Sequence, residues 1–254
     1  MKEFLLWQNK EDSIKLKHFE PKNKISEIAI IIFAGGAYRS KAEHEGDGYA
    51  KFLASKGYNA FVVDYHVFPY HFPQQLLDAR RAIRYVRFNA DKFGVSKEKI
   101  YVMGSSAGGH LASLVSTYLG EIDGEGVDEI DNEDYLPNGQ ILCYPVISSS
   151  EEIGHLSSFE MLLGENYNIK DKFSTDKLIN KTTPKAFIWH TSSDPCVDVR
   201  NSLIYAEKLK EYDIPFEMHI FPIGRHGLGL ATEEEPYVSK WSKLLLDWIK
   251  LNDN

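Results

Sequence analysis

The stretch from residue 99 to residue 119 constrains this chain most, because it places a serine in a setting with one mechanical explanation. Its middle, Gly104-Ser105-Ser106-Ala107-Gly108, fits the pattern G-x-S-x-G. The apolar residues 100–103 before it predict a short buried strand, and residues 110–119 after it have the apolar spacing of a helix. A sharp strand-to-helix turn crowds the backbone two residues to either side of its serine, where only glycine lacks a clashing Cβ. The pattern therefore predicts a strained Ser106 with an exposed hydroxyl.

The composition is typical of a globular α/β protein. The 254 residues, 43% of them hydrophobic, predict one large domain over residues 1–254 with a substantial core. No run approaches the roughly 18–20 apolar residues of a membrane span. A net charge of −8 argues against nucleic acid or an anionic membrane as partner. The first residues lack a signal-peptide pattern and the two cysteines do not indicate a disulfide scaffold, so we expect a cytoplasmic protein.

Apolar runs alternate with helical patterns along the chain, which predicts a mostly parallel sheet covered by helices on both faces. Two short strands are expected first, over 4–7 and 14–19, as a hairpin at a sheet edge. Further strands are predicted at 25–33, 59–65, 100–103, 140–145, 185–190 and 215–221. Helices are predicted at 48–56, 73–93, 110–119, 199–212 and 237–251. In such a fold, reactive groups gather beyond the carboxyl ends of the strands.

Two stretches interrupt this alternation. Residues 121–138 are acidic and contain three glycines, which predicts an exposed loop. Its part over 121–134 lacks the D-x-[DN]-x-[DN]-G spacing of a calcium loop, so a solvated loop is favoured over a calcium site. Residues 146–183 show no strong period and are interpreted as a small cap insertion, with one or two short helices, that roofs the site.

A serine hydroxyl is a poor nucleophile unless a base contacts it and a carboxylate holds that base. Among nine histidines, His226 lies in a glycine-containing turn after the last predicted strand and is the favoured base. His190, at a strand end, remains an alternative. Asp194 follows a predicted strand and is the favoured acid, while Asp198 lies near a helix start, where a carboxylate often caps. The order Ser106, Asp194, His226 is that of the α/β hydrolases.

An oxyanion requires two or more convergent N–H donors. One is expected from Ala107, directly after the serine. The others are expected from Gly36 and Ala37, in the glycine-containing loop that follows the first long buried strand. Small side chains there let the backbone approach a substrate closely.

Aromatic residues near the same strand ends are candidates for substrate contact. These are Tyr38, beside the glycine loop, and Tyr65 and His66, in the proline-containing loop over 65–73. Aromatic faces can stack on sugars, and a packed strand end is the alternative. Cys196, near the candidate acid, is either redox-sensitive or a small filling residue, of which the second is favoured.

The chain resembles the bacterial acetyl esterase and acetylxylan-esterase-like α/β hydrolases, which are related to the hormone-sensitive-lipase group. The resemblance covers the chain from about residue 14 and is carried by FAGGAY, NAFVVDYHVFPYHFPQQLLDARRAIRYVRFNADKFGVSKEKIYVMGSSAGGHLAS, HTSSDPCVDVRNSLIYAEKLK and HIFPIGRHGLGL. It implies serine-esterase chemistry on short acyl esters, often acetyl groups on sugars, with no cofactor and no metal. The roles it carries over are nucleophile for Ser106, acid for Asp194, base for His226, and oxyanion donors for Gly36, Ala37 and Ala107.

Three features depart from the family pattern. The glycine loop lacks the histidine of HGGG and has Ala37 where a third glycine is usual, Arg225 replaces a frequent glycine, and Cys196 lies beside the acid. The first two bear on substrate fit rather than on mechanism. The short, polar insertion predicts a small acyl group. A peptidase or formamidase with the same triad and a binding protein on an inactive scaffold are the competing interpretations, and the oligomeric state, a homo-oligomer included, is left open.

Overall fold

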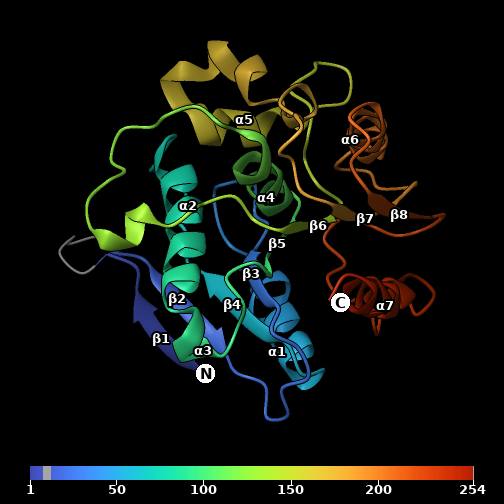
Figure 1. Ribbon diagram of the computed structural model, residues 1–254. Coiled ribbons are helices and arrows are strands. Elements are labelled where there is room, and N and C mark those ends of the chain that lie inside the picture. The colour runs from blue at the N-terminus through green and yellow to red at the C-terminus, as the bar shows by residue number, and fades with distance from the viewer. Residues whose placement is uncertain (8–12, 254) are drawn as a thin grey trace.

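One eight-stranded sheet runs through the protein (Figure 1). The computed structural model describes residues 1–7 and 13–253. The strand order is β1-β2-β4-β3-β5-β6-β7-β8. The first two pairings, β1 with β2 and β2 with β4, are antiparallel, and the pairings from β4 to β8 are parallel, as predicted. The strands are β1 (Lys2–Leu5), β2 (Lys15–Phe19), β3 (Ala29–Phe33), β4 (Asn59–Val63), β5 (Ile100–Ser105), β6 (Gly139–Cys143), β7 (Ala186–Thr191) and β8 (Phe216–Phe221).

Helices cover both faces of the sheet (Figure 1). The α-helices are α1 (Asp47–Ser55), α2 (Gln74–Phe88), α3 (Ala90–Phe93), α4 (Ala107–Thr117), α5 (Leu156–Leu163), α6 (Arg200–Glu211) and α7 (Trp241–Leu251). The 3₁₀-helices are η1 (Glu43–Glu45), η2 (Glu129–Asn132), η3 (Gly164–Phe173), η4 (Thr175–Lys177) and η5 (Val238–Lys240). No helix in the described part of the chain is both long and apolar enough to span a bilayer.

The central strands are buried on both faces, which explains their unbroken apolar runs. In β3, Ile30 and Ile32 pack into the core beneath α1 and α7. Their neighbours Ile31 and Phe33 pack into the core beneath α2, α4 and α6. Because side chains alternate along a strand, the apolar run of β3 contributes side chains to the cores on both faces of the sheet. Packing on both faces holds the carboxyl ends of the strands in fixed positions.

The long helix predicted over 73–93 is divided into α2 and α3. Asn89 lies between them, and its side-chain amide donates to the carbonyl oxygen of Tyr85 at 2.9 Å. A side chain that bonds the preceding turn competes with the helical ladder, which accounts for the interruption. Gly94 ends α3 in the left-handed conformation, with φ of 63°, as its position in the sequence predicts.

The strand predicted over 25–33 pairs only from Ala29. Before it, the Ser26 hydroxyl accepts a hydrogen bond from the Ile28 amide at 2.9 Å, a local turn that competes with strand pairing. The hairpin predicted at the sheet edge is confirmed, since β1 pairs with β2 and lies outermost. The turn predicted between its strands falls largely on residues 8–12, outside the described residues.

The acidic stretch between α4 and β6 is mostly exposed and irregular apart from η2, as its composition predicts, but arginines of α2 hold several of its carboxylates. Arg81 of α2 is 1% exposed and pairs with Asp128 at 2.6 Å and Asp131 at 2.9 Å. Arg80 pairs with Glu125 at 2.9 Å. The local sequence could not reveal this long-range pairing with buried guanidinium groups, which gives these carboxylates a structural role.

Residues 146–183 fold as α5, η3 and η4 beyond the carboxyl ends of the central strands (Figure 1). The apolar side of α5 faces inward, with Phe159 and Leu162 buried in the core beside α4. The Phe72 amide donates to the Leu162 carbonyl oxygen at 2.7 Å and fastens this cap to the loop before α2. Short helices are present here as predicted, and the interpretation of residues 146–183 as an insertion stays a prediction.

Candidate active site

Ser106 lies at the sharp turn between β5 and α4, with φ of 54° and ψ of −120°. A Cβ placed on Gly104 would fall 2.0 Å from the Gly108 carbonyl oxygen, and one on Gly108 would fall 2.1 Å from that of Phe33. Both glycines are therefore required by contact, as the spacing predicts. The helix begins at Ala107, earlier than predicted, so Ser106 lies directly at the amino end of α4, next to its first backbone amides.

The structure brings together the three side chains that the sequence analysis selected. The Oγ of Ser106 lies 2.8 Å from the Nε2 of His226. The Nδ1 of His226 lies 2.7 Å from the Oδ2 of Asp194. Because a carboxylate only accepts, Nδ1 carries the proton and Nε2 is left to accept from the serine hydroxyl. The three residues come from the carboxyl ends of β5, β7 and β8.

Asp194 is a buried acceptor with both oxygens engaged. Its Oδ1 accepts from the amides of Cys196 at 2.8 Å and Val197 at 3.0 Å. Burial by itself would raise the pKa of Asp194, but hydrogen bonds from His190 and His226 outweigh it and hold the pKa well below its ordinary value. The group is therefore an anion that orients the His226 imidazole and can stabilise its positive charge.

His190, the alternative base, lies behind the acid instead of beside the serine. It is fully buried, with Nδ1 2.8 Å from the Ser202 hydroxyl. Its Nε2 lies 3.0 Å from the Val197 carbonyl oxygen and 3.3 Å from the Oδ2 of Asp194. A carbonyl only accepts, so Nε2 carries the proton and can donate to Asp194 as well. His190 is therefore not the base that contacts the serine, but a neighbour of the candidate acid Asp194.

Two further polar residues near the acid have other partners. Asp198, the alternative acid, accepts from the Arg200 amide at 2.8 Å and pairs with the Arg200 guanidinium, so it stabilises the start of α6. The Sγ of Cys196 lies 3.6 Å from the Nε2 of His155. Cys196 is exposed, so it does not have the space-filling role in the core that the sequence predicts. Partial burial raises the pKa of its thiol, and the Asp194 charge acts in the same direction, which disfavours the reactive thiolate.

The glycine loop that follows β3 presents its backbone in left-handed conformations. Gly36, Ala37 and Tyr38 have φ values of 138°, 54° and 57°. A Cβ on Gly36 would lie 2.2 Å from the Ser40 carbonyl oxygen, so only glycine fits there. Among the described residues, the amides of Gly36, Ala37 and Ala107 donate to no other protein group. They are available as oxyanion donors, in keeping with the sequence analysis.

The three aromatic residues expected to contact substrate are otherwise engaged. Tyr38 is 0% exposed and its hydroxyl donates to His110 Nδ1 at 2.7 Å. Tyr65 is 0% exposed and its hydroxyl donates to a main-chain carbonyl oxygen at 2.6 Å. His66 is mostly buried and pairs with Asp78 at 2.8 Å. These side chains therefore pack at the strand ends, which is the alternative interpretation of the sequence. A tyrosine ring can be buried in a core when its hydroxyl has a hydrogen-bond partner.

His110 connects three parts of the site from inside the protein. Besides Tyr38 of the glycine loop, it contacts the Phe173 carbonyl oxygen of the cap, with Nε2 at 2.8 Å. Burial lowers the pKa of His110 to about 4, so the ring is neutral at pH 7. Through these two contacts His110 ties the glycine loop and the cap to α4.

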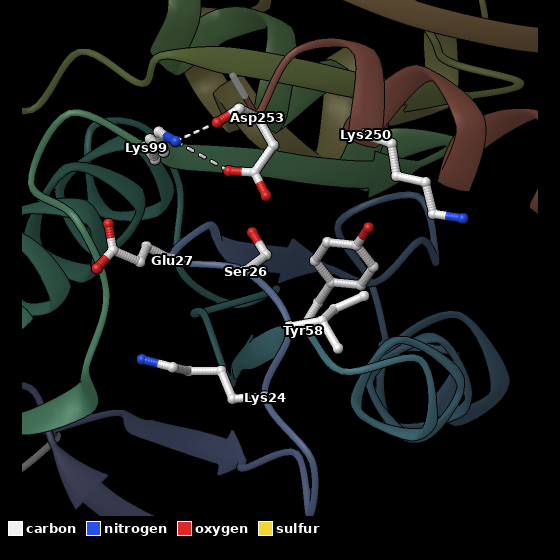
Figure 2. A pocket seen from close by; sticks show the side chains of 8 residues that line it. Lys24, Ser26, Glu27, Tyr58, Lys99, Lys250 and Asp253 are labelled. Atoms are coloured by element: carbon white, nitrogen blue, oxygen red, sulfur yellow. Dashed lines mark hydrogen bonds and ion pairs between the residues drawn. The ribbon is translucent and has the colours of Figure 1, made fainter.

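Hollows also open on the described surface away from the triad. Ser106 follows the carboxyl end of β5, whereas one hollow, of about 630 Å³, lies beside the amino ends of β3, β4 and β5 (Figure 2). It is lined by Lys24, Ile25, Ser26, Glu27, Tyr58, Lys99, Lys250 and Asp253. Lys99 and Asp253 pair across it at 2.9 Å. In residues 1–7 and 13–253, no cluster of three or more histidine, cysteine or acidic side chains is placed to hold a metal ion.

A mostly parallel sheet, a strained serine between strand and helix, and an imidazole and carboxylate from later strand ends define an α/β hydrolase. Residues 16–209 match the model of the BD-FAE family, and the chain belongs to that family. By class it is a carboxylic ester hydrolase of the α/β-hydrolase fold.

Several known proteins are similar over most of the chain. A crystal structure of an acetyl ester-xyloside bifunctional hydrolase from Caldicellulosiruptor lactoaceticus has 41% identity and a TM-score of 0.90, over 98% of this chain and 95% of that one. Endo-1,4-beta-xylanase B of Butyrivibrio fibrisolvens is 36% identical over 84% of this chain. An acetylxylan esterase of Xylanibacter ruminicola is 30% identical over 91% of this chain. The chain spans 34% and 47% of the length of these two curated relatives.

Proposed function

We propose that this chain hydrolyses short-chain acyl esters, above all acetyl esters of xylan-type carbohydrates, with Ser106, His226 and Asp194 as its catalytic triad. The observation that carries the proposal is the unbroken contact from serine to imidazole to carboxylate, at 2.8 Å and 2.7 Å. The printed names of an acetyl ester-xyloside hydrolase and an acetylxylan esterase among its relatives support the choice of substrate.

Acylation begins when Nε2 of His226 takes the proton of Ser106 Oγ as that oxygen attacks the ester carbonyl carbon. The carbonyl oxygen becomes an oxyanion, which the amides of Gly36, Ala37 and Ala107 stabilise. The tetrahedral intermediate collapses, the bond to the alcohol oxygen breaks, and the His226 imidazolium returns the proton to the leaving alkoxide. The products of this half-reaction are the free sugar hydroxyl and an acyl group on Ser106.

Deacylation repeats the same proton movements with water. His226 removes a proton from the water as its oxygen attacks the acyl carbon, and the oxyanion forms against the same three amides. Collapse breaks the bond to Ser106 Oγ, which recovers its proton from His226. One ester and one water thus become one carboxylic acid and one alcohol, with no redox change and no cofactor consumed.

The cap supports a small acyl group. The apolar side chains of α5, including Phe159, Leu162 and Leu163, are consumed by packing on the core beside α4. They are therefore not free to line a long hydrocarbon tunnel, which a lipase requires. We expect turnover of p-nitrophenyl esters to be highest for acetate and propionate and to fall as the acyl chain lengthens.

Hydrolysis of glycosides and of amides are the two activities that must be distinguished from ester hydrolysis. Glycoside hydrolysis generally uses two carboxylates that flank the scissile bond. At this site both oxygens of Asp194 are already engaged by amides and imidazoles, so it is not free for that role. Aryl xylosides and aryl acetamides therefore belong in the assay panel, and we expect ester cleavage to exceed both.

The test uses acetylated xylo-oligosaccharides and p-nitrophenyl acetate with wild type and Ser106→Ala. We expect acetate release by the wild type and a loss on the order of 10³-fold or more in the variant. Ser113→Ala, on the same helix but buried away from the turn, is the matched control and should retain turnover. A Ser106→Ala variant as active as the control would overturn the proposal, as would a wild type that cleaves only amides or xylosides.

A further inference from the structure

Glu45 is a buried carboxylate that the proposed reaction does not use. It ends η1, ten residues after Gly35, and is 3% exposed. Its Oε2 accepts from the Gly35 amide at 2.9 Å, and its Oε1 accepts from the Tyr144 hydroxyl at 2.7 Å. A buried carboxylate is costly unless its oxygens are hydrogen-bonded, and here each oxygen has a donor, so Glu45 is held in one place by these two contacts.

The first contact fixes the glycine loop against the serine. A Cβ placed on Gly35 would lie 2.4 Å from the Oε2 of Glu45 and 3.1 Å from the Cβ of Ser106. Gly35 is thus held between the carboxylate and the serine with no room for a side chain. The peptide that Glu45 holds directly precedes Gly36, whose amide is a proposed oxyanion donor.

The second contact reaches the loop that carries His226. The Tyr144 hydroxyl, which donates to Glu45, accepts from the Gly229 amide at 3.0 Å. The Tyr144 ring also packs edge-on against the His226 imidazole, with centroids 5.1 Å apart and planes at 72°. A Cβ on Gly227 would lie 3.7 Å from the Oε1 of Glu45, so the carboxylate borders this loop directly as well.

The hydroxyls behind the site form a chain with one consistent direction. Ser105 Oγ donates to the Tyr49 hydroxyl at 3.1 Å, and the hydroxyls of Tyr49 and Tyr144 are 3.1 Å apart. Each hydroxyl has one proton, and the Tyr144 proton goes to Glu45, so Tyr49 donates to Tyr144. The carboxylate, which only accepts, terminates the chain and orders every hydroxyl in it.

We infer that Glu45 is a positioning residue that holds the oxyanion donors and the general base at their working distances from Ser106. The inference rests on the proposed function, since it assigns Glu45 to the same reaction. One carboxylate binds the peptide before Gly36 and, through Tyr144, the backbone after His226. Displacements of about 1 Å at a catalytic group can cost on the order of 10²-fold in rate, so loss of this common anchor should lower turnover.

The test compares Glu45→Gln with Glu43→Gln, a matched change in the same short helix at an exposed position. Glutamine keeps the shape and one accepting oxygen but must donate to Tyr144, which reverses the hydroxyl chain. We expect kcat on p-nitrophenyl acetate to fall roughly 10- to 100-fold in Glu45→Gln with KM within about twofold, and to stay within about twofold in the control.

A double-mutant cycle separates positioning from general destabilisation. Tyr144→Phe removes only the hydroxyl between Glu45 and the His226 loop, and should lower kcat by about tenfold. If both act through one anchor, the double variant should lose much less than the product of the single losses. A multiplicative loss, a loss confined to KM, or a kcat of Glu45→Gln equal to the control would overturn the inference.

Two further outcomes remain decisive. If Glu45→Gln does not fold, Tyr144→Phe alone decides: a tenfold lower kcat supports the anchor and an unchanged kcat overturns it. If the wild type itself fails to hydrolyse the ester, the proposed function has failed, whereas an active wild type with unaffected variants refutes only the role of Glu45.

Discussion

The Nε2 of His190 lies 3.3 Å from the Oδ2 of Asp194, the same oxygen that contacts His226 at 2.7 Å. Two imidazoles therefore share one carboxylate oxygen, one in front of it and one buried behind. Only the front ring reaches Ser106, so the rear ring acts on the reaction through the orientation and charge of Asp194.

Replacing His190 by Asn should loosen the acid without touching the serine. Loss of a hydrogen bond to a charged group costs about 1.5–3 kcal/mol, which corresponds to roughly 10- to 100-fold in kcat when it falls on the transition state. Steady-state kinetics on p-nitrophenyl acetate would measure it. Ser202→Ala, which removes the partner of the other ring nitrogen, should cost less, and equal losses in the two variants would contradict this assignment.

Asp194→Asn and Asp198→Asn form a matched pair that tests which aspartate serves the base. The first leaves His226 without the acceptor that sets its tautomer, so we expect kcat to fall on the order of 10³–10⁴-fold. The second changes only the start of α6, and kcat should stay within about threefold. The reverse ranking would show that the acid has been misassigned.

His110 makes stability depend on acid pH. Burial lowers the pKa of His110 in the folded protein to about 4 from 6.5. Below about pH 6.5 the unfolded chain therefore binds a proton that the folded one does not. The free energy of unfolding should then fall by about 1.4 kcal/mol per pH unit, or roughly 3 kcal/mol by pH 4.

Urea unfolding of wild type and His110→Gln at pH 7 and near pH 4 isolates this contribution. The variant should be less stable at pH 7, because it loses contacts to Tyr38 and Phe173. It should also lose roughly 3 kcal/mol less than the wild type on acidification. Identical losses in the two proteins would show that His110 titrates normally.

Arg81→Met tests the structural role of the acidic stretch. The change removes the closest partner of the Asp131 carboxylate and leaves it with the Val127 amide at 2.9 Å and Arg84 at 3.9 Å, so the free energy of unfolding should fall by about 1–3 kcal/mol. Turnover measured well below the melting temperature should change little, because the pair lies outside the site. Added calcium should leave the melting temperature unchanged, and a clear rise would restore the calcium hypothesis.

Local pattern and spacing predicted most of the framework. The alternation of apolar runs and helical patterns predicted the parallel sheet, and the glycines around Ser106 predicted its strained turn. Asp194 and His226 were selected because they follow strands, and parallel strands end at one edge. These inferences needed only the periodicity of neighbouring residues and a rule of topology.

What the sequence could not predict depends on which distant side chains meet. The tyrosine hydroxyls that suggested substrate contact, such as that of Tyr65, are satisfied by buried acceptors. The acidic stretch meets Arg81 from a helix some 47 positions away. In the sequence, Glu45 is one of several charged residues in a polar segment, and nothing distinguishes it. Only the structure shows that it accepts hydrogen bonds from both Gly35 and Tyr144.

The most direct test of the account is covalent labelling of the wild type and Ser106→Ala with an alkyl fluorophosphonate, followed by intact-mass and peptide-mapping mass spectrometry. We expect one adduct per wild-type chain, located on Ser106, with parallel loss of acetyl esterase activity and no adduct in the variant. Labelling at another residue, or an unlabelled wild type that still hydrolyses acetyl esters, would contradict it.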